Sequence, residues 1–148
     1  MLTATLKTIF QRELEKLKRE IELYKDETNL WIIEKSITNS SGNLCLHLIG
    51  NLNTYIGKEL GRTGYIRNRD LEFSQKNIPR SVLIEKIDET ILIVEKGLEP
   101  LSIQQMEQEY PVPVFDYKMT TGYFLVHLLS HLTYHLGQIN YHRRLLDD

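Results

Sequence analysis

The chain has 148 residues, the size of one domain, and its 41% hydrophobic and 26% charged content is typical of an ordinary folded protein. Its formal net charge of −2 argues against a polyanionic partner, so we expect one domain over residues 1–148 and no nucleic acid. The single cysteine excludes an intramolecular disulfide and cysteine-rich zinc sites, and no apolar run approaches the ~18 residues of a membrane span, so we expect a cytoplasmic protein with no membrane partner.

Apolar residues recur at steps of three and four over residues 3–24, which predicts a first amphipathic helix. A long connection follows, and we expect Trp31 to pack underneath it. The Asn/Ser/Gly cluster at its end can cap a second helix, predicted over residues 41–60. Residues 61–80 carry two glycines, a proline and four arginines without helical spacing. A loop of this length is usually functional or crosses the whole molecule.

Ser81 is expected to cap a third helix that ends near Gly97. Two prolines in the segment that follows forbid regular helix there, although residues 102–110 can form a short turn of their own. A fourth helix is predicted over residues 120–146. With no convincing strand signal, these elements predict an all-α protein, a four-helix bundle whose core is the bundle interior.

The last predicted helix contains the stretch HLLSHLTYH, which places His127, His131 and His135 at four-residue intervals. On a helical wheel they share one arc with Gln138 and His142, at the border of the apolar face. Imidazoles in a poorly hydrated groove need partners for both ring nitrogens, and a metal ion is one such partner. Residues four apart can bind one ion, whereas His127 and His135 lie about 12 Å apart along the axis and cannot share it. Spacing alone leaves open whether the ligand pair is His127/His131 or His131/His135.

A third ligand has to come from another element, and the only histidine elsewhere is His47, in the second predicted helix. It belongs to a polar stripe with Asn51 that faces either solvent or the wall of a polar pocket. The alternatives to a ligand are a solvated or hydrogen-bonded His47 and, for His142 beside Arg143 and Arg144, a residue favoured by the helix dipole. Spacing does not decide between a metal and these alternatives.

The motifs SSGNLCLHLIGNLNTYIG and HLTYHLGQINYHRRLL, in this order, resemble the DinB/YfiT-like superfamily of bacterial four-helix bundles. The likeness covers nearly the whole chain and includes the connection with Trp31 and the closing HxxxHxxQ motif. It implies an up-down-down-up helix order in which residues 61–80 travel the length of the bundle. It also implies one divalent transition metal, zinc, nickel or similar, held by His47, His131 and His135, and no organic cofactor.

Members of that superfamily with assigned activity are mostly metal-dependent transferases or isomerases that use a thiol such as bacillithiol, mycothiol or glutathione. The resemblance therefore implies an S-transferase whose partners are a low-molecular-weight thiol and a small electrophile. A homodimer is also expected, because bundles of this superfamily commonly pair and because apolar residues of the irregular segments need cover. These apolar residues are Trp31, Ile32, Ile33 and Phe115.

Other residues are candidates for roles around the metal, and none is assigned as catalytic. Gln138 and Asn51 are candidates to orient the ligands, and Tyr55, His127 and Tyr134 are candidates to line the pocket. Arginines of the 61–80 segment are candidate contacts for substrate carboxylates, the alternative being a solvated charged loop. They are Arg62, Arg67, Arg69 and Arg80.

Two other functions stay open. A metal-dependent hydrolase would use the same open metal position. However, no carboxylate of the second or fourth predicted helix lies on the histidine arc, and Glu59 and Asp116 are the nearest candidates for a general base. Alternatively, a bundle that kept the fold and lost the chemistry would act in protein interaction.

Overall fold

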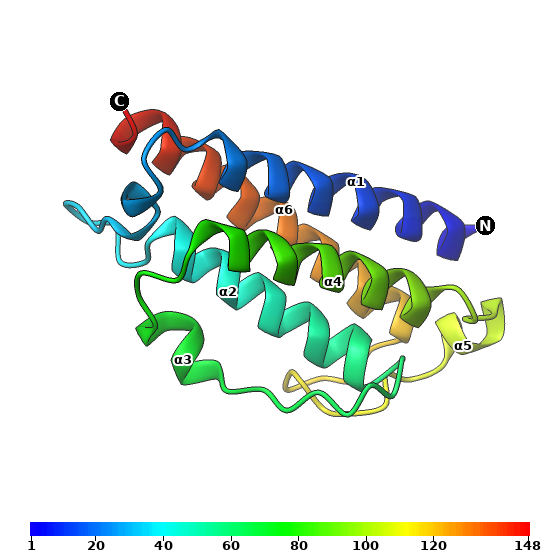
Figure 1. Cartoon of the computed structure of the whole chain (residues 1–148). Coiled ribbons are helices and arrows are strands. Elements are labelled where there is room, and N and C mark those ends of the chain that lie inside the picture. Colours follow the sequence, from blue (N-terminus) through cyan, green and yellow to red (C-terminus); the bar gives the residue numbers. More distant parts are fainter.

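The computed structural model describes all residues, 1–148, and its regular elements are all helices, which confirms the all-α prediction. The long helices are α1 (Leu2–Leu23), α2 (Ser41–Leu52), α4 (Arg80–Leu98) and α6 (Thr121–Leu146). Both α1 and α2 pack against α4 and against α6, so these helices enclose one apolar core (Figure 1). α1 and α6 end at the same end of the molecule, where α2 and α4 begin (Figure 1).

Capping side chains fix several helix ends. The Thr120 hydroxyl accepts a hydrogen bond from the backbone N–H of Tyr123 at the start of α6, and Ser102 forms a capping box with Gln105 at the start of α5 (Ile103–Glu107). α5 is the short turn expected between the prolines and α4. The prediction that Ser81 caps the third helix is wrong. The Pro79 carbonyl accepts from the Val82 N–H at 2.9 Å, so the first turn of α4 closes earlier and Ser81 lies inside the helix.

The π-helical segment η2 (Asn53–Lys58) continues α2 directly and lies within the second helix predicted over residues 41–60, although its π geometry was not predicted. The structure also contains short helices in segments expected to be irregular. The 3-10 helix η1 (Glu27–Trp31) interrupts the first long connection. The segment 61–80, expected to be irregular, contains α3 (Arg69–Ser74), whose cap is Asn68. These elements are only one or two turns long, too short for a hydrophobic period to reveal them.

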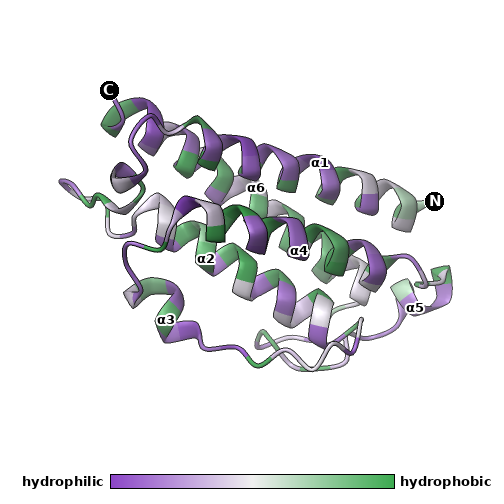
Figure 2. Ribbon diagram, viewed as in Figure 1, coloured by the Kyte–Doolittle hydropathy of each residue, from purple (hydrophilic) through white to green (hydrophobic).

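α2 is buried along its entire length. α4 and α6 cover two of its sides, and α3 packs against another (Figure 1). The side-chain amide of Asn43 donates to the backbone carbonyls of Glu72 at 2.9 Å and of Gln75 at 2.8 Å, which holds α3 against α2. In Figure 2, by contrast, α1 presents hydrophilic residues on its outer side. Because α3 covers this side of α2, the polar stripe of α2 lies in the wall of a pocket and does not face solvent.

His142 lies near the end of α6, where a residue favoured by the helix dipole was expected, but it is also buried, with only 4% exposed. Its Nε2 donates to the Ile32 carbonyl at 2.9 Å, since a carbonyl only accepts, and its Nδ1 lies 2.7 Å from the Tyr24 hydroxyl. That hydroxyl lies 2.8 Å from the Ser41 hydroxyl. His142 therefore links the end of α6 to the end of α1 and to the first connection.

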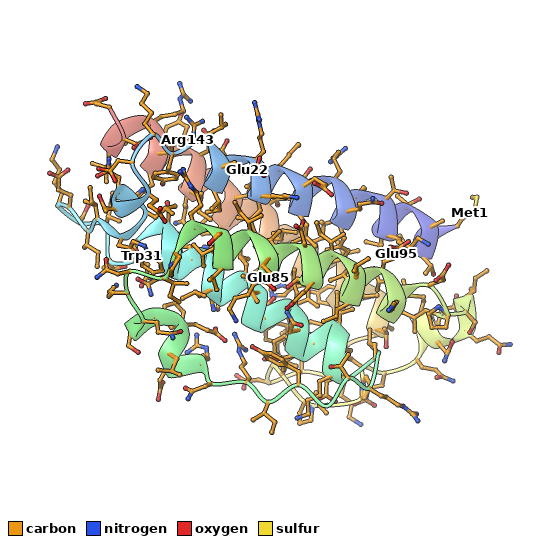
Figure 3. The ribbon with its side chains drawn as sticks, viewed as in Figure 1. Met1, Glu22, Trp31, Glu85, Glu95 and Arg143 are labelled. Atoms are coloured by element: carbon orange, nitrogen blue, oxygen red, sulfur yellow. The ribbon has the colours of Figure 1, made fainter.

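Trp31 packs underneath the first connection, as predicted. Its side chain lies beside the start of α2 (Figure 3), where an added Cβ on Gly42 would come within 2.6 Å of the indole ring. Ile32 and Phe115 are also partly covered, so Ile33, at 49% exposed, is the most open of the apolar residues expected to need cover. None of the helices combines the length and apolar character needed to span a bilayer.

Candidate metal centre

Three imidazoles converge between α2 and α6. His47 comes from the middle of α2, and His131 and His135 come from successive turns of α6. Nε2 of His131 lies 3.1 Å from Nε2 of His47 and 3.1 Å from Nε2 of His135, and ligand atoms of all three residues lie within 4.8 Å of one another. His127 does not join them. Its ring stacks on Phe124 at a centroid distance of 5.9 Å.

Hydrogen bonds on the outer side of two rings determine which nitrogens face the centre. Nδ1 of His47 lies 3.1 Å from a Glu72 carboxylate oxygen, which only accepts, so Nδ1 carries the hydrogen and Nε2 presents a lone pair. Nδ1 of His135 donates to the Gln138 amide oxygen at 2.7 Å, with the same result. Two lone pairs therefore face Nε2 of His131, and a single N–H there cannot satisfy both. A metal ion satisfies all three nitrogens.

The spacing of the nitrogens fits a metal. Zinc–nitrogen bonds of ~2.0–2.1 Å at angles of ~90–110° place two ligand nitrogens ~2.8–3.4 Å apart. Both 3.1 Å contacts fall within this interval. Three neutral imidazoles suit zinc, nickel and related ions, and a set of three protein ligands leaves at least one position for another molecule.

The site also keeps the histidines in the form that binds metal. Burial, followed by the nearby rings of His135, His47 and His127, lowers the pKa of His131 to about 4. Burial likewise lowers the pKa of His135, against the opposing effect of its hydrogen bond to Gln138. Both rings are therefore neutral at pH 7, with lone pairs free for a cation.

Glu72, on α3, is the residue of this site that the sequence did not reveal. Its carboxylate is 6% exposed and accepts hydrogen bonds from His47 and from Nε and Nη2 of Arg67, both at 2.9 Å. Burial by itself raises the pKa of the Glu72 carboxyl, but the hydrogen bonds from His47 and Arg67 outweigh it and hold this pKa below its usual value. Gly50 provides the space, because an added Cβ there would lie 1.9 Å from a Glu72 oxygen.

A partial signal for Glu72 existed in the sequence. Asn68 is a good capping residue, and Asp70 and Glu72 lie in the first turn after it, the pattern of a helix start. That pattern could have predicted α3. It could not have predicted that α3 docks on α2, because this contact depends on tertiary packing.

Only two of the four candidate anion-binding arginines lie near the histidines. Arg67 and Arg69 line a cavity of about 180 Å³ beside His47 and His131. Arg62 is exposed in the turn after η2, and the guanidinium of Arg80 donates to backbone carbonyls at the end of α1. Arg62 and Arg80 line neither cavity beside the histidines, so the structure does not bring these two candidates together with the centre.

The other candidate residues separate into two groups around the centre. Asn51, Tyr55 and His127 line the same cavity of about 180 Å³. Tyr134 and Gln138 lie on the other side of His135, where they line a larger cavity of about 520 Å³. Gln138 bonds a ligand ring as expected, whereas Asn51 makes no hydrogen bond to a histidine. Glu59 and Asp116, the carboxylates considered as bases, line neither cavity.

Comparison with known protein families places the whole site inside one domain. The sequence profile of the family described as "Protein of unknown function (DUF1572)" matches residues 3–148. The chain belongs to this family. The three histidines and Glu72 all lie within the matched residues, so the candidate metal centre is part of the DUF1572 domain. A search of the curated proteins finds no match to the chain.

We predict that His47→Ala, His131→Ala and His135→Ala each lower the affinity for Zn²⁺ or Ni²⁺ by orders of magnitude, because each removes a direct ligand. Titration calorimetry on protein purified without a histidine tag measures this affinity. His127→Ala is the matched control on the same helix and should bind metal nearly as tightly as the wild type. If His127→Ala abolishes binding while His135→Ala does not, the ligand pair is His127/His131.

A second prediction concerns the carboxylate behind His47. Glu72→Gln should weaken metal binding by about 10- to 100-fold, because the neutral amide holds His47 and Arg67 less firmly. Gly50→Ala should act in the same direction, since its Cβ would displace the carboxylate. Gly137→Ala is the control, because a Cβ there meets nothing within 4 Å. Wild-type affinity in both Glu72→Gln and Gly50→Ala would contradict this role of Glu72.

The lowered histidine pKa values predict how the metal-free protein responds to acid. An unfolded histidine has a pKa of 6.5 and folded His131 a pKa of about 4, so between these values the unfolded chain binds more protons. Stability should therefore fall as the pH drops from 6.5 to 4, which urea unfolding at several pH values measures. His131→Asn should reduce this dependence. An unchanged pH dependence in His131→Asn would show that other groups cause it.

Proposed function

We propose that the protein is a DinB-like four-helix bundle in up-down-down-up order and a metal-dependent S-transferase. One divalent transition metal, zinc, nickel or similar, would bind His47, His131 and His135. The observation that carries the proposal is the convergence of their Nε2 atoms, with the outer nitrogens of two rings held by Glu72 and Gln138. α2 and α4 run in one direction and α1 and α6 run in the opposite direction (Figure 1), which supports this helix order.

The cavities on either side of the histidines support a reaction with two substrates. The larger cavity, of about 520 Å³, is reached past His135 and Gln138 and is lined by no Lys, Arg, Asp or Glu. The smaller one, of about 180 Å³, is reached past His47 and His131. Two molecules can therefore approach the same centre from different sides. We assign the larger cavity to the thiol and the smaller one to the electrophile.

A bound divalent ion supplies an activated thiol, because it lowers the pKa of a coordinated S–H group so that the thiolate is present at neutral pH. In the transfer, the thiol would give its proton to water, a sulfur–carbon bond would form, and the leaving group would depart as an anion with the electrons of its broken bond. The chain's own part is to hold the ligands neutral and oriented through Glu72 and Gln138.

The surroundings of the centre favour a thiol over water as the nucleophile. The nearest carboxylate, Glu72, already accepts hydrogen bonds from His47 and from Arg67 and so is not free to take a proton from water. A hydrolase of this design would lack an obvious general base. A metal-bound thiol does not require one, because the ion has to lower a pKa of ~8.5 only slightly to give the thiolate, whereas the pKa of free water is ~15.7.

The protein loaded with Zn²⁺ or Ni²⁺ should consume a thiol such as bacillithiol or glutathione in the presence of 1-chloro-2,4-dinitrobenzene, releasing chloride. Removal of the metal with a chelator should stop the reaction, and His131→Ala should lack activity, because both changes take away the centre that activates the thiol. Absorbance of the thioether product measures the rate. Ester cleavage without thiol loss would indicate a hydrolase instead. A protein that binds no metal would indicate a non-catalytic bundle that acts in protein interaction.

We also propose that the protein is a cytoplasmic homodimer. Cys45 is buried and unpaired, as expected in a reducing compartment. The outer side of α6 carries a stripe of large exposed side chains that a second copy could cover. They are Tyr123, Val126, Tyr134, Tyr141 and Leu145. Light scattering should give the mass of a dimer, and a monomer at high micromolar concentration would contradict this proposal.

A further inference from the structure

Two buried polar atoms beside the candidate metal centre have no hydrogen-bond partner, Asn51 Oδ1 and His131 Nδ1. Asn51 is only 7% exposed, and both residues line the cavity of about 180 Å³. With Nε2 of His131 turned to the centre as a ligand, its Nδ1 carries the hydrogen and is a donor, whereas the amide oxygen is an acceptor. A hydroxyl group can both donate and accept, so one hydroxyl suits this pair.

The same cavity carries one positive charge, that of Arg69, which no carboxylate of the chain pairs. Arg67 and Arg69 line it, and no Asp or Glu does. Arg67 uses Nε and Nη2 for Glu72, which leaves Nη1 without a hydrogen bond. Arg69 forms no ion pair, and its guanidinium lies 5.2 Å from the ring centroid of Phe73. Guanidinium groups with free N–H donors match a carboxylate.

Aromatic rings form the remaining walls. Phe115 and His127 meet edge to face at 4.9 Å, and Tyr55 and Phe124 do so at 5.1 Å. These four rings line the cavity together. Aromatic rings pack well on a planar, apolar ligand, and the small volume of the cavity excludes a large ligand.

We propose that this cavity selects a small planar organic anion that carries a carboxylate and a hydroxyl. Arg69 and Nη1 of Arg67 bind the carboxylate, Asn51 and Nδ1 of His131 bind the hydroxyl, and the rings enclose the body between them. That this anion is the second substrate rests on the proposed S-transferase function. The binding site itself rests only on the cavity and its unpaired groups.

Equilibrium binding of 4-hydroxybenzoate to the full chain, with and without Zn²⁺, tests the proposal by titration calorimetry. Two related probes each lack one group: benzoate lacks the hydroxyl, and 4-hydroxybenzamide lacks the charge. 4-Hydroxybenzamide should bind at least tenfold more weakly than 4-hydroxybenzoate in either form of the protein. Benzoate should do so in the form loaded with Zn²⁺, where Nδ1 of His131 is a donor. Arg69→Gln should weaken 4-hydroxybenzoate at least tenfold and leave 4-hydroxybenzamide unchanged, and Asn51→Leu should reduce 4-hydroxybenzoate to the level of benzoate.

Arg62→Gln is the matched control, because Arg62 lies on the same segment but outside the cavity. Since Arg69 is exposed, Arg69→Gln gives a decisive result even if the buried Asn51→Leu variant does not fold. The proposal is overturned if the probes bind equally, if Arg62→Gln acts as strongly as Arg69→Gln, or if binding needs Zn²⁺ and ignores both substitutions. Selective binding without thiol consumption would instead overturn the S-transferase and leave this site in place.

Discussion

The hydrogen bond between His47 and the Glu72 carboxylate is the interaction on which the candidate centre depends. An ionised carboxylate in a buried position is costly unless it is paired, and here Arg67 donates two hydrogen bonds and His47 a third. The arrangement requires α3 to lie close to α2, which Gly50 permits and Asn43 secures through the backbone of α3. A segment whose sequence resembles a charged loop thus supports the ring of His47, a candidate metal ligand.

The burial of α2 on every side follows from the same docking. A helix between two other helices could leave its polar stripe in water, but α3 closes that side and turns the stripe inward. Asn43 and His47 then find partners on α3. Asn51 makes no hydrogen bond to α3 and lines the cavity instead, with its amide oxygen unpaired. The docking of α3 therefore leaves the amide oxygen of Asn51 without a partner, at a place where a ligand in the cavity can supply one.

The parts of the fold that could be predicted are those whose cause is local. Thr120 marks the start of α6 because a helix cap depends only on residues close to it in the sequence. Likewise, the helix repeat places His131 and His135, four residues apart, on successive turns of one face. Glu72 and His142 could not be predicted in their roles, because each acts on residues far away in the sequence. His142 resembles an ordinary helix-end residue until the end of α1 and the first connection pack around it.

The apolar core explains how the centre can be prepared before any ion binds. A continuous cluster of 27 buried hydrophobic residues joins all four long helices, and none of the three histidines belongs to it. A core of this size can support folding without a metal, unlike the small core of a zinc finger. The core instead holds α2 and α6 at a fixed separation. This keeps the Nε2 atoms of the three histidines at a spacing that suits ligands of one ion, although the rings crowd one another. A cation bound between the rings would relieve that crowding, and because the packing already positions the rings, little of its binding energy would be lost in ordering them.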